Sequence, residues 1–243
     1  MEARALPSRL SMEFILNQTF LCSAVPAEMM DRLWASGWRH FGESFFRYNI
    51  SMDEDGVKQV TPLRLDLEKN LLSKSQRRVL RRNVDLRWDF VPAQLTEDAR
   101  AMFQRHKARF KENVPDDLAS FLSSEPATVP SECLQCRVFE GDCLIALSYL
   151  DVGESATSAV YGMFEPEHSW RSLGIFTMLL EIEFSRSRGC RYCYPGYATH
   201  EPSAYDYKKQ LRGLEVLDWK TGKWDALPHD EPAIQASFIP PKL

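Results

Sequence analysis

The second half of the chain constrains the fold most, because its pattern changes from strands to a helix and back to a strand. Three strands separated by turns are predicted first, at Leu134–Phe139, Cys143–Val152 and Ala156–Phe164. A helix over Ile175–Arg188 follows and ends at Gly189, and a further strand runs over Arg191–Tyr197. A meander followed by a helix and a strand predicts an α+β fold of mixed, mostly antiparallel sheets flanked by helices.

The first half fits the same fold class. A short helix is predicted over Met29–Ser36, strands over Trp38–Ile50 and Val60–Leu67, and a helix over Glu97–Glu112. The connection Val114–Ser131 is rich in Pro and Ser. We therefore expect two regions, 1–115 and 116–243.

Composition excludes several classes of protein. With 243 residues, 44% of them apolar, the chain buries a substantial core, and the net charge of −4 gives no uniform positive field. A polyanion site must therefore be a local patch. No apolar run approaches the ~18 residues that span a bilayer, so we expect no membrane partner and a cytoplasmic location.

Such a patch is predicted over 73–83. Ser73 and Gln76 have the spacing of a capping box, which begins a helix. Five cations fall on one face of that helix: Lys74, Arg77, Arg78, Arg81 and Arg82. Like charges at these spacings cost ~0.2–0.5 kcal/mol per pair, so the face either binds phosphates or is a solvated surface with acidic partners elsewhere.

Two further segments suggest a site. Arg171-Ser172-Leu173-Gly174 stands between a strand and a helix, where backbone amides bind anions in some folds, although such a segment is more often a plain turn. Pro195-Gly196 interrupts the last strand of the second half, and such a break opens a sheet beside a bound ligand. Tyr207-Lys208 offers a hydroxyl and a cation for such an opening, although an aromatic cluster is more commonly only core packing.

Metal binding is not expected. Cys133/Cys136 and Cys190/Cys193 have C-x-x-C spacing, but each pair falls in a predicted strand, where residues three apart face opposite sides. The five histidines have no ligand spacing, so we predict neither a metal nor a cofactor.

Several motifs together resemble the arginyl-tRNA-protein transferases and the bacterial leucyltransferases that act on N-terminal Asp or Glu. The resemblance rests on Gly37–Gly42, Lys74–Leu86, Ser158–Tyr161, Arg171–Gly174 and Tyr194–Tyr197, which follow the order of the family's motifs. It implies a fold built from GNAT-like units, as one unit or as two such halves. The family's cysteine cluster has no counterpart in Ile50–Thr61, and its K-M pair is Ala204-Tyr205 here.

The resemblance also implies roles for single residues. Charged tRNA, as co-substrate, would bind the five cations together with Arg171, Ser172 and Gly174. Catalysis would involve Tyr197, Tyr207 and Lys208, with Asp151, expected beside Tyr161, as a ligand of the acceptor amine. Trp38, Arg39, Tyr161 and Tyr205 would bind the substrates.

The function implied is transfer of an aminoacyl group, Arg or Leu, from tRNA to an acceptor amine. No covalent nucleophile is needed, because the ester is already activated. The acceptor is a peptide N-terminus by resemblance, and the changed K-M pair leaves a small-molecule amine open. Two rival functions also stay open, an acetyl-CoA-dependent acetyltransferase and a non-catalytic tRNA-binding module.

Overall fold

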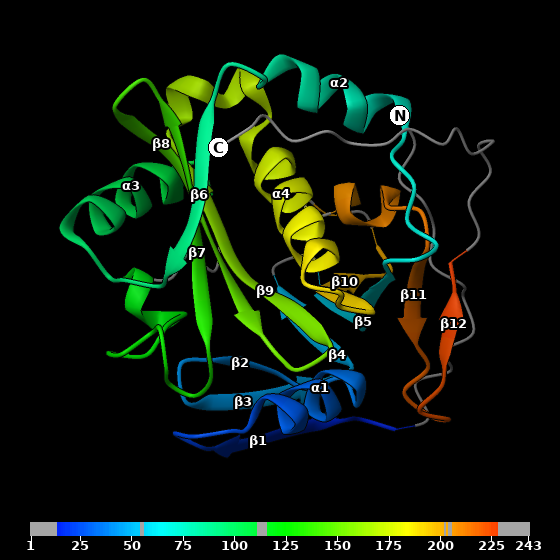
Figure 1. Cartoon of the computed structure of the whole chain (residues 1–243). Coiled ribbons are helices and arrows are strands. Elements are labelled where there is room, and N and C mark those ends of the chain that lie inside the picture. Colours follow the sequence, from blue (N-terminus) through cyan, green and yellow to red (C-terminus); the bar gives the residue numbers. More distant parts are fainter. Residues whose placement is uncertain (1–13, 54–55, 111–115, 202, 204–205, 228–243) are drawn as a thin grey trace.

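The computed structural model describes residues 14–53, 56–110, 116–201, 203 and 206–227. Its strands form a nine-stranded mixed sheet and a separate three-stranded sheet (Figure 1). In the large sheet the order is β12-β11-β5-β10-β9-β8-β7-β6, and β4 pairs with β5 beside this path. Its strands are β4 (Ile50–Asp53), β5 (Gly56–Asp66), β6 (Arg87–Pro92), β7 (Cys133–Glu140), β8 (Cys143–Val152), β9 (Ala156–Phe164), β10 (Tyr192–Thr199), β11 (Leu214–Leu217) and β12 (Trp224–Ala226).

The small sheet has the order β1-β3-β2 and carries helix α1. These elements are β1 (Asn17–Leu21), α1 (Ala27–Ala35), β2 (Arg39–Phe41) and β3 (Ser44–Tyr48). The single strand predicted over Trp38–Ile50 is wrong, because the chain turns at Gly42, whose φ of 51° suits a glycine. That turn places Arg39 and His40 on β2, facing the large sheet.

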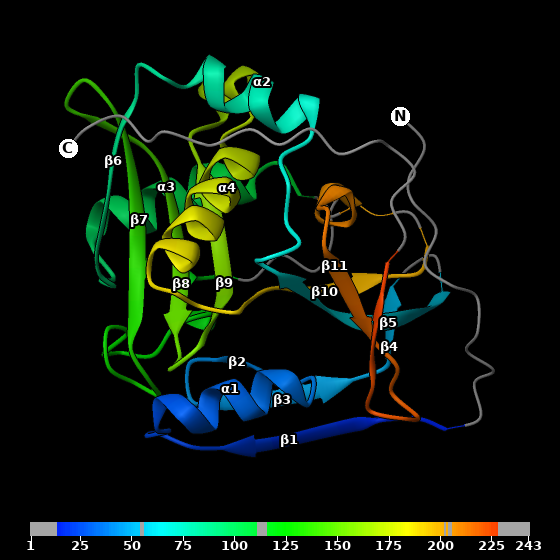
Figure 2. The same cartoon turned by 45° about the vertical axis from the view of Figure 1, so that its right-hand side comes forward.

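Two helices cover opposite faces of the large sheet. Along β8 the side chains alternate, so that Ala146 packs on the side of α4 (Leu173–Ser187) and Leu147 on the side of α3 (Glu97–Lys107). In Figures 1 and 2, α4 crosses one face of the sheet. Helix α2 (Lys74–Arg82) lies across the N-terminal end of α4. Three short 3₁₀ helices complete the fold: η1 (Leu118–Ser120), η2 (Pro166–Arg171) and η3 (Asp206–Gln210).

The predicted fold class is confirmed. All strand pairs are antiparallel except β9 and β10, which run parallel and are joined by α4, as in a GNAT-like fold. Strands from both sides of residue 115 pair in the large sheet. The division into regions 1–115 and 116–243, and the alternative of two GNAT-like halves, stay predictions. Within the part of the chain described, no helix is long and apolar enough to cross a membrane.

Candidate active site

The opening predicted at Pro195-Gly196 is present between β9 and β10. The two strands pair from Tyr192 to Tyr194 and then separate, β9 continuing along β8 and β10 along β5. The register of β10 shifts between Cys193 and Gly196, where Gly196 has a φ of 100°. A β-bulge of this kind re-aims a strand, and here it opens a gap in the sheet beneath α4.

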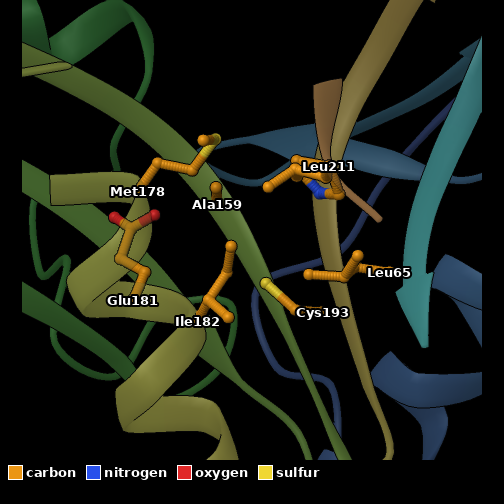
Figure 3. A pocket seen from close by; sticks show the side chains of 8 residues that line it. Leu65, Ala159, Met178, Glu181, Ile182, Cys193 and Leu211 are labelled. Atoms are coloured by element: carbon orange, nitrogen blue, oxygen red, sulfur yellow. The ribbon is translucent and has the colours of Figure 1, made fainter. Parts of the chain in front are cut away.

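A small cavity of about 10 Å³ lies at this opening, about the room that one water molecule needs. Figure 3 shows Glu181 and Ile182 on α4, with Cys193 and Leu65 among the residues opposite them. The lining residues are Leu65, Ala159, Met178, Glu181, Ile182, Cys193, Pro195 and Leu211. The only charged group in this apolar lining is the carboxyl of Glu181.

Glu181 is buried, with 4% of its surface exposed. Its Oε1 has no hydrogen-bond partner among the described residues. Burial raises the pKa of this carboxyl to about 7, while the nearby Ser148 hydroxyl and the Lys208 ammonium act in the other direction. A carboxyl poised near neutral pH in a cavity has the property of a general base.

Lys208 lies beside this carboxyl, on η3. A Cβ atom placed on Gly196 would be 3.4 Å from the Lys208 Nζ, so the ammonium sits directly against the bulge. Burial lowers the pKa of Lys208 to about 8, Glu181 raises it and Arg39 lowers it further. The opening therefore holds a carboxyl and an amine that both titrate near neutral pH.

Arg39 and Tyr197 connect the neighbourhood of this site with the segment Gly37–Trp38. The Arg39 guanidinium donates hydrogen bonds to the carbonyls of Trp38 at 2.5 Å and Leu63 at 3.3 Å. It faces the ring of Tyr197 at 5.6 Å, and burial lowers its pKa. The Tyr197 hydroxyl donates to the Gly37 carbonyl at 2.6 Å, and burial raises its pKa. Both side chains are thus held in place and keep their protons at neutral pH.

Asp151 lies elsewhere than expected. It pairs with Ser158 across β8 and β9, whereas Tyr161 pairs with Tyr149, so the expectation that Asp151 lies beside Tyr161 is wrong. The antiparallel register is the reason, because it places Tyr149, two residues before Asp151, opposite Tyr161. Asp151 is buried, and its Oδ2 lies 2.7 Å from the His40 Nε2.

The His40–Asp151 pair joins the two sheets. The His40 Nδ1 donates to the Gly42 carbonyl at 2.8 Å, so its Nε2 carries a second proton when it donates to the carboxylate. Burial alone would lower the pKa of His40, but Asp151 and the Gly42 carbonyl raise it above the ordinary value. The geometry therefore makes Asp151 a structural partner of His40, and its role at the acceptor amine stays a prediction.

The remaining predicted substrate and catalytic residues are dispersed. Tyr161 stacks on Phe121 with ring centroids 4.1 Å apart, on the α3 side of the sheet and away from Glu181. Trp38 is half-buried, with the Arg47 guanidinium 4.8 Å from its ring. Tyr207 packs against the core under α4, and Tyr205 lies outside the described residues.

The basic helix is present and capped as predicted. The Ser73 Oγ accepts a hydrogen bond from the Gln76 backbone at 3.2 Å, and the Gln76 side chain accepts one from the Ser73 backbone at 2.8 Å. Lys74, Arg78, Arg81 and Arg82 are exposed on α2, while Arg77 is half-buried and bonded to the Leu72 carbonyl. Four exposed cations on one short helix form a local positive patch.

Arg171 does not belong to that patch. It is buried, and its guanidinium binds both carboxylate oxygens of Asp85, at 2.8 and 3.1 Å, and Glu140 at 2.5 Å. Its Nη1 also reaches the Arg82 carbonyl, which ties the end of α2 to the start of α4. This geometry supports a positioning role, and the predicted contact with tRNA gains no support from it.

The turn after Arg171 begins α4 two residues earlier than predicted. Ser172 has a φ of 58° and precedes the first helical residue, and its Oγ accepts a hydrogen bond from Arg82 at 3.2 Å. A Cβ on Gly174 would contact Phe164 at 3.5 Å, which is ordinary packing. The anion-binding role predicted for Ser172 and Gly174 stays a prediction.

Reversing the charge of the patch tests its role in tRNA binding. We expect Arg78→Glu/Arg81→Glu to weaken binding of uncharged tRNA by at least about tenfold at low salt and to reduce the salt dependence of the dissociation constant. Filter binding over a salt series measures both. Lys223→Glu, at an exposed position before β12, is the control, and equal losses in both variants would contradict a specific patch.

The cysteine pairs do not gather ligands. Cys133 and Cys136 pack on opposite faces of β7, as predicted. The prediction that Cys190 and Cys193 lie in one strand and face opposite sides is wrong, because Cys190 precedes β10 and packs on the same side as Cys193. Burial raises the thiol pKa values of all four. Among the described residues, no group of three or more His, Cys, Asp or Glu could hold a metal.

Glu181 is the site residue that sequence reasoning missed. A charged residue amid the apolar side chains of Leu173–Ile182 was the available signal, because a carboxylate on the buried side of a helix is costly unless it has a function. The interpretation of that helix as apolar core concealed it.

Sequence comparison finds relatives of known activity. A family model described as "Arginine-tRNA-protein transferase, C terminus" matches residues 99–218, which include β9, α4, β10 and both Glu181 and Lys208. The aspartate/glutamate leucyltransferase of Thiobacillus denitrificans is 28% identical over 228 residues, covering 91% of this chain and 90% of the relative. The chain is thus similar to aminoacyl-tRNA-protein transferases over most of its length.

Other matches of this transferase are more distant or shorter. The aspartate/glutamate leucyltransferase of Cereibacter sphaeroides is 32% identical over 165 residues, which cover 64% of the transferase and 58% of that relative. Among solved structures, L-PGS from Bacillus licheniformis aligns with a TM-score of 0.43 and 14% identity, over 75% of this chain and 53% of that one.

Proposed function

We propose that the protein transfers leucine from leucyl-tRNA to the α-amine of an N-terminal Asp or Glu in an acceptor peptide. Aminoacyl transfer is the activity of its family, and the leucyltransferase names of relatives that align with most of the chain support leucine and an acidic acceptor. The protein then has two substrates, the charged tRNA and the acceptor peptide. It needs a site that binds the tRNA phosphates and a site where the peptide amine reacts.

Glu181 serves the amine in this proposal. An α-ammonium group, with an ordinary pKa of about 8, must lose a proton before it attacks an ester. The Glu181 carboxylate, half ionised near pH 7, accepts that proton by way of one water molecule, for which its cavity has room, and the free electron pair of the nitrogen then forms a bond to the ester carbonyl carbon. The bonded nitrogen gives up a second proton, the bond from the carbonyl carbon to the terminal ribose oxygen breaks, and the oxygen leaves with that proton.

Lys208 serves the ester. The tetrahedral intermediate carries a negative charge on the former carbonyl oxygen, and an ammonium at the β10 bulge stabilises it there. The bulge contributes because Gly196 has no side chain to keep an ester away from the Lys208 Nζ. Arg39, whose charge already acts on Lys208, adds positive potential.

One observation carries the assignment. A buried carboxyl with a pKa of about 7 and an amine with a pKa of about 8 lie together at the only break in the parallel pair of the described sheet. Separated acid and base pKa values near neutrality are the pattern expected of general acid–base catalysis.

The proposal is tested with tRNA charged with radiolabelled Leu or Arg. Each is incubated with the protein and peptides that begin with Asp, Glu, Arg or Ala, and acid-stable label on peptide is counted. Label from leucyl-tRNA on the Asp and Glu peptides alone is the expected result. Transfer only to amines of a cell extract would show a small-molecule acceptor instead. Acetylation from acetyl-CoA would show an acetyltransferase. Binding of tRNA without any transfer would show a non-catalytic tRNA-binding module.

A further inference from the structure

Trp170 is exposed in a way that the fold does not explain. It stands in η2, directly before the buried Arg171, and 59% of its surface is exposed. Among the described Trp and Phe side chains in the exposed class it has the largest exposed fraction. A ring of this size normally packs in a core, so an exposed one suggests that a ligand covers it in the complex.

Two guanidinium groups lie beside Trp170. The Arg171 guanidinium lies 4.5 Å from the ring centroid and is itself paired with Asp85 and Glu140. The Arg82 Nη1 donates to the Trp170 carbonyl at 2.6 Å. Because Arg82 belongs to the positive patch of α2, the indole stands at the end of that patch.

An aromatic ring beside a cationic patch has the composition of a site for single-stranded nucleic acid. Cations hold the backbone, and every base presents a π face that stacks on an aromatic side chain. Between this ring and the proposed base, α4 runs from Leu173 to Glu181, a rise of about 12 Å. A strand that leaves the patch at Trp170 thus runs along α4 toward the opening between β9 and β10.

We propose that Trp170 is a stacking platform for a base of the single-stranded 3′ end of the donor tRNA. The inference rests on the proposed function, which supplies a tRNA as donor, and adds the residue that directs its 3′ end from α2 toward Glu181. The cations set the affinity for the duplex, and the indole fixes where the single strand begins its path.

Binding of uncharged tRNALeu to Trp170→Ala, Trp170→Phe and wild-type protein tests the platform. Stacking of one base is worth enough for about a tenfold change in the dissociation constant. We expect Trp170→Ala to bind about tenfold more weakly, Trp170→Phe to recover part of the loss, and both to keep the wild-type salt slope. Arg78→Ala should instead lower that slope by about one.

A second tRNA, without its single-stranded 3′ end, isolates the contact. On this tRNA, wild-type protein and Trp170→Ala should bind equally, and Leu21→Ala, an exposed apolar position on β1, should match wild type on both tRNAs. An unchanged dissociation constant, an equal loss on both tRNAs, or a change confined to the KM for the peptide would overturn the platform. Leucine transfer by the wild-type protein is measured separately, so failure of the proposed function remains distinguishable.

Discussion

Glu181→Gln is expected to lower kcat for leucine transfer by about two to three orders of magnitude, the contribution typical of a general base. Gln keeps the shape of the side chain but cannot accept the proton of the acceptor ammonium. The KM for peptide should change little, because Glu181 lines a cavity too small to hold a peptide side chain. Single-turnover transfer with excess enzyme measures the step directly.

The pH profile distinguishes a base from a merely structural carboxylate. With the pKa of Glu181 at about 7, the wild-type rate should rise with pH through about 7 as the carboxylate forms. In Glu181→Gln the rise should move to about 8, the ordinary pKa of the acceptor amine itself. Glu183→Gln, two residues along the same helix, is the matched control, because Glu183 is half-buried and bonded to Arg186.

The same substitution should stabilise the protein at alkaline pH. The folded pKa of Glu181 is raised from 4.5 to about 7, so its contribution to stability is fully present below about 4.5 and is lost as pH rises through about 7. A shift of this size corresponds to about 3 kcal/mol. Tm of Glu181→Gln should therefore exceed that of wild type at pH 8 and approach it at pH 4, while a Tm below wild type at pH 8 would contradict the buried, ionised carboxylate.

Asp151→Asn should destabilise the protein by about 3 kcal/mol at pH 5.5, because it leaves a buried His40 cation without its counter-charge. The folded pKa of His40 is raised, so the contribution of the pair is fully present below the unfolded value of 6.5 and is lost as pH rises through the folded pKa. The loss should thus shrink at alkaline pH, where a neutral His40 accepts a hydrogen bond from the new amide. Urea unfolding over pH 5.5–9 measures the free energy of unfolding.

A surface pair on the same sheet gives the matched control. Asp89 binds Arg137 through both oxygens, with about a third of each side chain exposed, so Asp89→Asn should cost less than about 1 kcal/mol at either pH. If Asp151→Asn cost no more than this control, the pair would not join the sheets as proposed. If it lowered kcat of folded enzyme at alkaline pH, Asp151 would instead act at the acceptor amine.

Features with local causes could be predicted from the sequence. The capping box at Ser73 and Gln76 depends on two residues three apart, and the β10 break depends on Pro195-Gly196, so both are visible without tertiary structure. The strands of the second half were predicted for the same reason, since alternation and turns are properties of neighbouring residues.

What escaped prediction depends on contacts between distant segments. Arg171 was interpreted as an anion ligand, yet Asp85 and Glu140, 86 and 31 residues away, occupy its guanidinium. Asp151 was misplaced because the register of β8 against β9 is set by their pairing, which puts Tyr149 and not Asp151 opposite Tyr161. Glu181 was missed because its pKa is set by burial, which a helix pattern alone does not show.

The clamp that Arg171 makes between α2 and α4 has a further consequence. It fastens α2, the helix proposed to bind phosphates, to the helix that bears Glu181. In the proposed function the spacing between the two ends of the donor site is therefore fixed. We expect the enzyme to prefer donors whose single strand, from the last base pair to the ester, has the length that matches this spacing.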